Sequence, residues 1–308
     1  MAKNIAASRQ KKPGGLSDKV SDIVLVVICA AVMLIVAYPL YYVLVASFSD
    51  PYDVYAGKTF LLPSQFTLKG YQAVFADSAL FSGFMNSIKY TVIGTIYSVV
   101  MIYLVAYPLS VKDLPGRKYI SLFFVITMYF GGGLIPTYLV IQRLQMLNTI
   151  WALILPGCLS VYNMIVARTF FKSNISEELY EAAEIDGCTQ ARFFFQIALP
   201  LSKAIIAILV LYYGVGHWNS YFSALVYISD KAKYPLQLVL RNILITNQTA
   251  LSQTATTAAA RAALQEKQQL IDVMKYSLII ISSIPVLVMY PLVQKHFVKG
   301  VMIGSMKG

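Results

Sequence analysis

A short acidic segment between two apolar runs holds the residues whose types and spacing most clearly suggest a function. It reads Ile175-Ser176-Glu177-Glu178-Leu179-Tyr180-Glu181-Ala182-Ala183-Glu184-Ile185-Asp186-Gly187. Ser176 is a favourable helix N-cap, and the two acids after it suit the positive end of a helix dipole. Ile175 and Tyr180 have the spacing of a hydrophobic staple, and Gly187 supplies a left-handed stop. The segment therefore predicts a helix of about ten residues, roughly 15 Å long, which is too short and too acidic to cross a bilayer.

Four residues of this predicted helix recur at spacings of three and four, and so share one side: Leu179, Ala182, Ala183 and Asp186. Two alanines on that side would let the surface of another protein approach the helix backbone closely. The chemistry expected here is docking to a partner through Glu181, Ala182, Ala183 and Gly187, with Leu179 and Asp186 beside them. The alternative is an ordinary amphipathic helix on the protein surface.

The chain shows no pattern that predicts catalysis, nucleotide binding or a metal site. Gly57-Lys58-Thr59 resembles the end of a phosphate-binding loop, but Tyr52 stands where the first glycine should be and no strand precedes it. No span contains paired carboxylates, a Cys-His cluster or a nucleophile elbow, and the three cysteines have no ligand or disulfide spacing. We therefore expect no bound cofactor and no enzymatic activity in this chain alone.

Composition places these residues in an all-α membrane protein. Of 308 residues, 58% are hydrophobic and 13% are charged, with a mean hydropathy of +0.65. That charged fraction is about half of what covers a water-soluble domain. Since about 20 apolar residues of helix cross a bilayer, the apolar runs predict six spans. They cover about 23–46, 87–107, 119–141, 150–171, 201–225 and 273–293, and the first is too long for a cleaved signal peptide.

The distribution of Lys and Arg predicts the orientation of these spans. With the N-terminus inside, the cytoplasmic segments hold fourteen Lys and Arg and the external ones eight, if residues at span ends are not counted. The net charge of +11 is therefore explained by topology, and no aromatic-interleaved basic patch points to nucleic acid. This predicts a cytoplasmic segment 1–22, a permease domain 23–300 and a cytoplasmic tail 301–308. Loop 172–200 is then cytoplasmic and loop 226–272 external.

The docking segment resembles a family signature. Glu181-Ala182-Ala183, three residues, Gly187, nine residues and then Ile197-Ala198-Leu199-Pro200 are similar to the EAA signature of ABC-importer permeases. This resemblance implies a type I (MetI-like) permease fold in which the EAA helix couples the transmembrane helices to an ATPase. It also implies a bacterial plasma or inner membrane, with both termini cytoplasmic.

Further segments resemble the carbohydrate branch of this family, in particular its MalG-like half and the LplC/YtcP type. They are Tyr129–Tyr138, Asn148–Ala152, Arg168–Phe171 and Gly216–Phe222. The resemblance implies a second, non-identical permease, two ATP-binding subunits that hold ATP and Mg, an extracellular solute-binding lipoprotein and a carbohydrate substrate. Three alternatives remain: an ion-coupled carrier acting alone, a non-transporting scaffold or sensor, and an importer of peptides or lipid-linked cargo. The absence of Asp and Glu from the predicted spans argues against ion coupling.

Several residues are candidates for the translocation path. Three consecutive glycines before Pro136 predict a loosened helix, either a pathway-lining hinge or a site of close helix packing. Amide and aromatic groups near the outer end of the fifth span suit a sugar site, or alternatively an interfacial aromatic belt. Asn86 and Asn163 could face the path or join helices. The full candidate set is Tyr129, Gly131, Gly132, Gly133, Asn163, His217, Trp218, Asn219 and Tyr221. In addition, the Ala-rich stretch 254–270 predicts a helix in the external loop.

Overall fold

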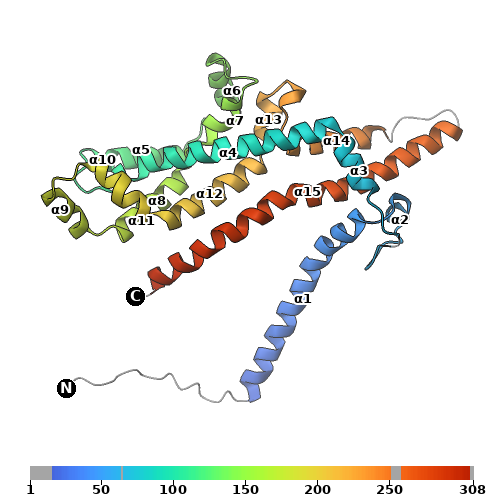
Figure 1. The fold of residues 1–308 in the computed structure, drawn as a ribbon, viewed down its shortest axis with the longest axis horizontal. Coiled ribbons are helices and arrows are strands. Elements are labelled where there is room, and N and C mark those ends of the chain that lie inside the picture. The colour runs from blue at the N-terminus through green and yellow to red at the C-terminus, as the bar shows by residue number, and fades with distance from the viewer. Residues whose placement is uncertain (1–15, 64, 251–257, 306–308) are drawn as a thin grey trace.

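The computed structural model describes residues 16–63, 65–250 and 258–305, which form helices and short connections (Figure 1). The α-helices are α1 Leu16–Ser47, α2 Pro51–Tyr55, α3 Lys69–Ala76, α4 Ser78–Ala106, α5 Arg117–Tyr129, α6 Leu134–Arg143, α7 Ile150–Ile154, α8 Val161–Asn174, α9 Glu177–Ile185, α10 Gln190–Phe193, α11 Leu199–Leu201, α12 Lys203–Trp218, α13 Phe222–Tyr227, α14 Leu236–Ala250 and α15 Ala258–Ser305. Three 3-10 turns lie at Pro108–Ser110, Leu155–Gly157 and Lys231–Lys233, and a π-helical segment at Phe194–Ala198. Within the described ranges, the β-structure is a single bridge between Ser49 and Phe66.

Three helical stretches are long and apolar enough to cross a membrane: Val20–Ser47, Ser78–Ser110 and Gln268–Pro291. Three more candidates are pairs of helices bent at a short break. They are Arg117–Tyr129 with Leu134–Arg143 at 114°, Ile150–Gly157 with Val161–Asn174 at 56°, and Gln190–Leu201 with Lys203–Trp218 at 76°. By length and composition, the chain therefore has up to six spans if each bent pair crosses once, in line with the six-span all-α prediction.

The helix bounds differ in several places from the predicted span bounds. The helix of the second span begins at Ser78, nine residues before the predicted 87. Within predicted span 119–141, the helix is broken after Tyr129. Within predicted span 201–225, the helix ends at Trp218, and a short connection leads to α13. The sixth helix already includes Ala258, so the part of the predicted external helix 254–270 that is described belongs to α15.

Both ends of the predicted domain division also fall inside helices. Residues 16–22 of the predicted N-terminal segment are the first turns of α1, and α15 runs to Ser305 within the predicted tail. Residues 1–15, 251–257 and 306–308 lie outside the described part.

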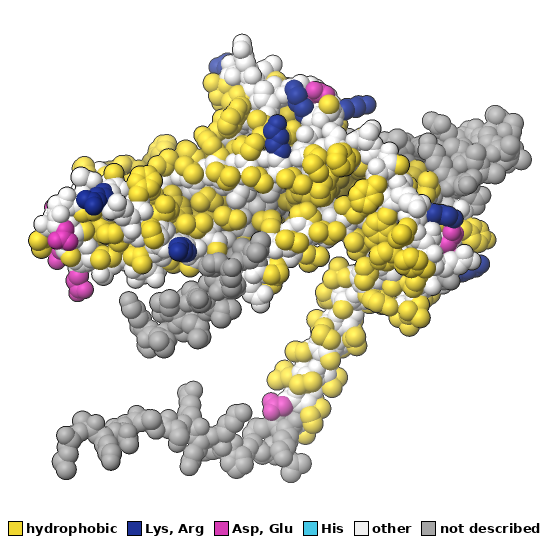
Figure 2. Space-filling model, viewed as in Figure 1, with side chains coloured by type: hydrophobic (Ala, Val, Ile, Leu, Met, Phe, Trp, Pro, Cys, Tyr) yellow, Lys and Arg dark blue, Asp and Glu magenta, His cyan; other side chains and the backbone are white. Residues whose placement is uncertain are grey.

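The bundle places polar segments at its two ends and apolar surface between them. In Figure 1, α4 and α12 lie along the long axis with α9 at one end, and α2, α3 and α14 lie at the other. The end of α15 is directed toward the α9 end, whereas α1 diverges from the bundle and starts below its middle in this view. Figure 2 shows apolar side chains over the middle of the molecule and acidic side chains at the α9 end. The most apolar window of the first span is 0% buried within the chain, so α1 stands away from the bundle along most of its length.

Candidate functional site

Helix α9 forms where the sequence predicts it, but its N-terminal cap differs from the expected one. Ser176 occupies the N-cap position with extended backbone, and Glu177 and Glu178 lie in the first turn. The Ser176 side chain accepts no capping hydrogen bond, so the expected hydroxyl cap is absent. Glu177 instead forms an ion pair with Lys112 in the turn after α4. Because both side chains are more than half exposed, this pair contributes little stability.

The C-terminal end of α9 is closed by a Schellman motif. Gly187 has φ +72°, in the left-handed region that favours glycine. The amide of Cys188 donates to the carbonyl of Ala183 at 2.8 Å, and the amide of Gly187 donates to Glu184 at 3.0 Å. These are the two hydrogen bonds that define the motif. The glycine therefore sets the angle at which the chain leaves the helix.

The inner face of α9 packs against the core of its own chain. Ile175 and Ala183 are buried, and Leu179 and Tyr180 pack against the same core cluster. The ring of Tyr180 stacks on Phe193 of α10 with centroids 4.2 Å apart. Burial raises the pKa of the Tyr180 phenol, so this side chain stays neutral at physiological pH. Ala183, expected at the docking contact, is therefore covered by this chain, and Leu179 beside it is half-buried against the same cluster.

The outer face of α9 is a narrow exposed stripe. It consists of residues at i, i+3, i+4 and i+7: Glu178, Glu181, Ala182 and Ile185. Ile185 is 87% exposed, which is unusual for a large apolar side chain on an otherwise acidic helix. Sequence reasoning missed Ile185, although its spacing of three from Ala182 would have revealed it. Asp186 and Gly187 are also exposed, directly after the stripe.

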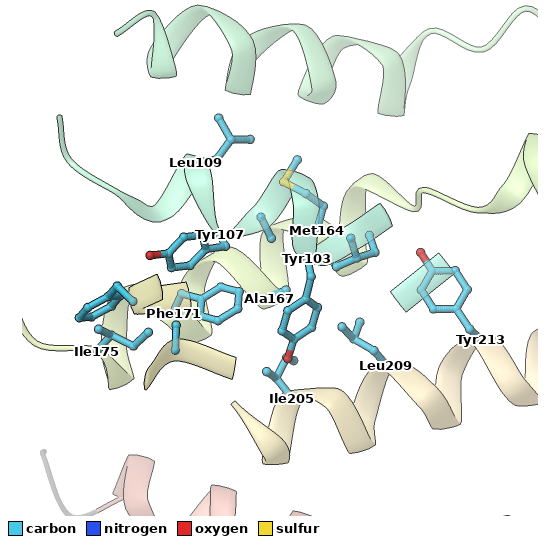
Figure 3. Packing of buried hydrophobic residues seen from close by; sticks show 14 of the residues in the cluster. Tyr103, Tyr107, Leu109, Met164, Ala167, Phe171, Ile175, Ile205, Leu209 and Tyr213 are labelled. Atoms are coloured by element: carbon cyan, nitrogen blue, oxygen red, sulfur yellow. The ribbon is translucent and has the colours of Figure 1, made fainter. Parts of the chain in front are cut away.

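Aromatic contacts connect α9 to three membrane helices. In the π-helical segment that follows α10, the ring of Phe194 lies 4.7 Å from the ring of Tyr107, the residue directly after α4. Tyr103 of α4 contacts Phe171 of α8 at 5.3 Å, and its hydroxyl lies 3.0 Å from Ser202, at the start of α12. Figure 3 shows Tyr103, Tyr107 and Phe171 together in this cluster. Packed rings therefore form a continuous connection from α9 to α4, α8 and the start of α12.

The turn after α4 is fixed to the same end of the bundle. Arg168 donates from Nε to the carbonyl of Leu109 at 3.0 Å, and Arg117 donates to the carbonyl of Val111 at 3.1 Å. A cavity of about 560 Å³ separates this turn from α9, with Glu181 and Tyr180 among its lining residues. The α9 end thus combines a rigid inner attachment with an open polar recess.

The candidates at the end of the fifth span separate into two groups. Trp218 is buried, and its indole N–H donates to the carbonyl of Ser282 at 2.9 Å, so it joins α12 to α15 and does not line a path. The His217 ring packs on Gly94, where its Nε2 lies 3.4 Å from the Ser98 hydroxyl. These two side chains have structural contacts inside the bundle.

The remaining two candidates of this group are exposed. Tyr221 is 42% exposed at the start of α13. The side-chain amide of Asn219 donates to the carbonyl of Val215 in its own helix and is otherwise on the surface. Asn219 and Tyr221 therefore stay available to a ligand.

The glycine-rich break lies on the surface of the molecule. Tyr129 ends α5 with 75% exposure, and Gly133, with φ +84°, precedes α6. A Cβ built on Gly131 or Gly133 meets no heavy atom within 4 Å, so close packing within this chain does not explain these glycines. The predicted kink is present as the 114° bend, and the glycines allow it.

The two asparagines differ in their surroundings. Asn86 donates from its amide to the carbonyls of Ala232 at 2.8 Å and Tyr234 at 3.1 Å, so it anchors the loop before α14. Asn163 is half-buried in the first turn of α8. Of the two, only Asn163 keeps its place as a candidate for the path.

One close approach inside the bundle gives a direct test of the packing. A Cβ on Gly94 would lie 2.8 Å from the His217 ring, whereas a Cβ on Gly216 meets nothing within 4 Å. We expect Gly94→Ala to destabilise the subunit by about 1–3 kcal/mol through overpacking. Gly216→Ala, the matched control in the neighbouring helix, should be neutral. Thermal unfolding of the purified subunit in detergent measures both, and equal melting temperatures would contradict this packing.

Taken together, these features define a multi-pass helical membrane protein with a short acidic helix whose inner face is fixed to its core. No protein-family model matches the chain. It is 39% identical to the polygalacturonan/rhamnogalacturonan transport system permease protein YtcP of Bacillus subtilis over 275 residues, 89% of this chain and 94% of that protein. It is also 39% identical to protein LplC of the same organism over 292 residues, 95% and 96% of the two chains.

A solved structure agrees with these relatives. A chain of a bacterial ABC transporter that imports the acidic polysaccharide alginate matches with a TM-score of 0.83 and 29% identity, over 93% of this chain and 99% of that chain. The chain belongs to the family of ABC-importer permease proteins. It is a transport subunit, and a separate ATPase subunit hydrolyses ATP.

Proposed function

We propose that this chain is one of two unlike permease subunits of an importer for oligosaccharides or polysaccharide fragments. The exposed stripe on α9 carries the proposal, because an apolar Ile185 beside Glu178, Glu181 and Ala182 needs a protein partner to cover it. The relatives support the cargo class, since YtcP is named for polygalacturonan and rhamnogalacturonan and the solved relative for alginate. The partners are a second permease, two ATPases and an extracellular binding protein.

The proposed orientation places α9 and both termini in the cytoplasm of a bacterial cell. The excess of Lys and Arg in the segments assigned inside supports this, as does the direction of α15 toward the α9 end in Figure 1. The loop that Asn86 anchors is then external, on the side where a binding protein delivers cargo.

Transport follows from the attachment of α9. When the ATPases close on ATP, they carry the outer stripe with them, and the inner face moves α4, α8 and α12 through the packed rings. The spans then reorient around a path shared with the second permease. Tyr129, Gly131–Gly133, Asn163, Asn219 and Tyr221 are the proposed contacts or hinges of that path.

The test is reconstitution with the co-purifying partners in lipid nanodiscs. A trigalacturonate presented with its binding protein should raise ATP hydrolysis several-fold over the basal rate, and a peptide of similar size should not. If the peptide stimulates ATP hydrolysis and the trigalacturonate does not, the cargo is a peptide and not an oligosaccharide. Uptake driven by an ion gradient in liposomes holding this chain alone would overturn the importer mechanism.

A further inference from the structure

A second cavity lies at the end of the bundle opposite α9. It has a volume of about 460 Å³ and lies between α14 and α15. Most of its lining is aliphatic, including Leu240, Ile243, Met274, Leu278 and Ile279. No aromatic side chain is among the described residues that line it. Because sugar sites place aromatic faces against the apolar side of the ring, this lining is better suited to a hydrocarbon chain.

Two cations from different helices line the same cavity. Arg241 comes from α14 and Lys275 from α15, and the described lining contains no carboxylate. None of the four ion pairs in the described chain includes either residue. The Lys275 ammonium lies 4.8 Å from the centroid of the neighbouring Tyr276 ring, which leaves it free to bind an anion as well. Two half-buried cations beside apolar surface favour an anion between them, and a guanidinium matches phosphate oxygens in particular.

The position of the cavity along α15 fits the edge of a membrane. Its lining includes Ser282, whose carbonyl accepts the Trp218 indole inside the bundle. Lys275 lies seven residues, or about 10 Å, farther toward the outer end of the helix. Beyond Ser282, α15 continues as apolar surface, with Leu287 67% exposed. Long basic side chains at this depth reach the headgroup layer.

We infer that this cavity binds an anionic phospholipid. The phosphate lies between Arg241 and Lys275, and an acyl chain follows the aliphatic wall of α14 and α15. The lipid would hold α14, which carries the external loop, against the last span. The inference uses the membrane embedding of the chain but does not depend on the nature of the cargo.

The experiment measures lipid retained by the purified importer complex. The complex is exchanged into micelles with phosphatidylglycerol or phosphatidylcholine, and bound lipid is counted by native mass spectrometry. Two variants are compared with the unmodified complex: the double change Arg241→Gln with Lys275→Gln, and Leu240→Trp, which fills the cavity while both cations remain. The control is Arg143→Gln with Lys231→Gln, which removes two exposed cations outside the cavity. Co-purification of all subunits shows that each variant assembles.

We expect retention of phosphatidylglycerol over phosphatidylcholine in the unmodified complex and in the control. Loss of both basic contacts in the double variant should weaken phosphatidylglycerol binding about 30-fold, and Leu240→Trp should displace the lipid as well. Unchanged retention in either variant overturns the inference. Displacement of the lipid by trigalacturonate, with direct binding of that sugar in lipid-free micelles, would assign the cavity to a carboxylated glycan instead.

Discussion

Substitution of Gly187 by valine is expected to abolish glycan-stimulated ATP hydrolysis and uptake while the subunit still inserts and assembles in the membrane. The residue has φ +72°, where a β-branched side chain is strongly disfavoured at a cost of about 1–2 kcal/mol or more. That strain is small beside the stability of a typical domain, about 5–15 kcal/mol, so the chain should stay folded. It is relieved by opening the hydrogen bond from Cys188 to Ala183, which redirects the exit from α9 and misplaces the stripe.

A matched control separates backbone strain from loss of docking. Gly57 has φ +68° after α2, and a Cβ there also meets no heavy atom within 4 Å. Gly57→Val therefore introduces the same local strain at the opposite end of the molecule and should leave ATPase stimulation within about twofold of the original. If both variants lose transport equally, strain alone explains the effect. If Gly187→Val keeps full glycan-stimulated ATP hydrolysis and uptake, the turn at Gly187 has no role in coupling.

The second large effect is expected at Ile185. Covering this side chain with an ATPase surface contributes about 1.5–3 kcal/mol, so Ile185→Asp should weaken ATPase binding by about 10- to 100-fold or more. Ile185→Leu keeps the apolar volume and should retain coupling. The measurement is the affinity of the purified ATPase for the permease pair in nanodiscs, followed by stimulated ATP hydrolysis.

The control for Ile185→Asp adds the same charge to the same loop. Thr189 caps α10 by accepting the amide of Arg192, and aspartate performs this role equally well. Thr189→Asp should therefore leave the affinity unchanged. Equal losses in both variants would mean that the loop responds only to added negative charge. Unchanged binding of Ile185→Asp would exclude the stripe as the docking surface.

Local chemistry explains which parts of the docking segment were predictable. The start of α9 and the left-handed glycine follow from residue types alone, because a cap position and a positive φ are properties of a few neighbouring residues. Which residues form the outer face of α9 does not follow from residue types alone. Leu179, Ala182 and Ala183 have the spacing of one side, but the stack of Tyr180 on Phe193 decides which of them turn inward. That contact joins separate helices and has no signal within the segment.

The same distinction holds for the spans. Their apolar composition predicts six crossings but not the end of α12 at Trp218, whose side chain is hydrogen-bonded to Ser282 in a distant helix. Three glycines predict a kink after Tyr129 but not its 114° angle, which depends on where α6 packs. His217 and Trp218 have the residue types of a sugar site, and the bundle uses both for packing.

The breaks in the three bent spans differ in whether their backbone groups find hydrogen-bond partners within the chain. At two breaks the chain supplies its own partner: the Tyr213 hydroxyl accepts the amide of Ser160 at 2.9 Å, and the Tyr103 hydroxyl donates to the carbonyl of Ser202 at 3.3 Å. At the third break, the described residues offer no partner to the backbone of Gly131 or Gly132. Hydrocarbon cannot satisfy these groups. If this break lies within the hydrocarbon layer, the ring of annular lipid around the subunit is interrupted there, and water or a neighbouring subunit borders the protein.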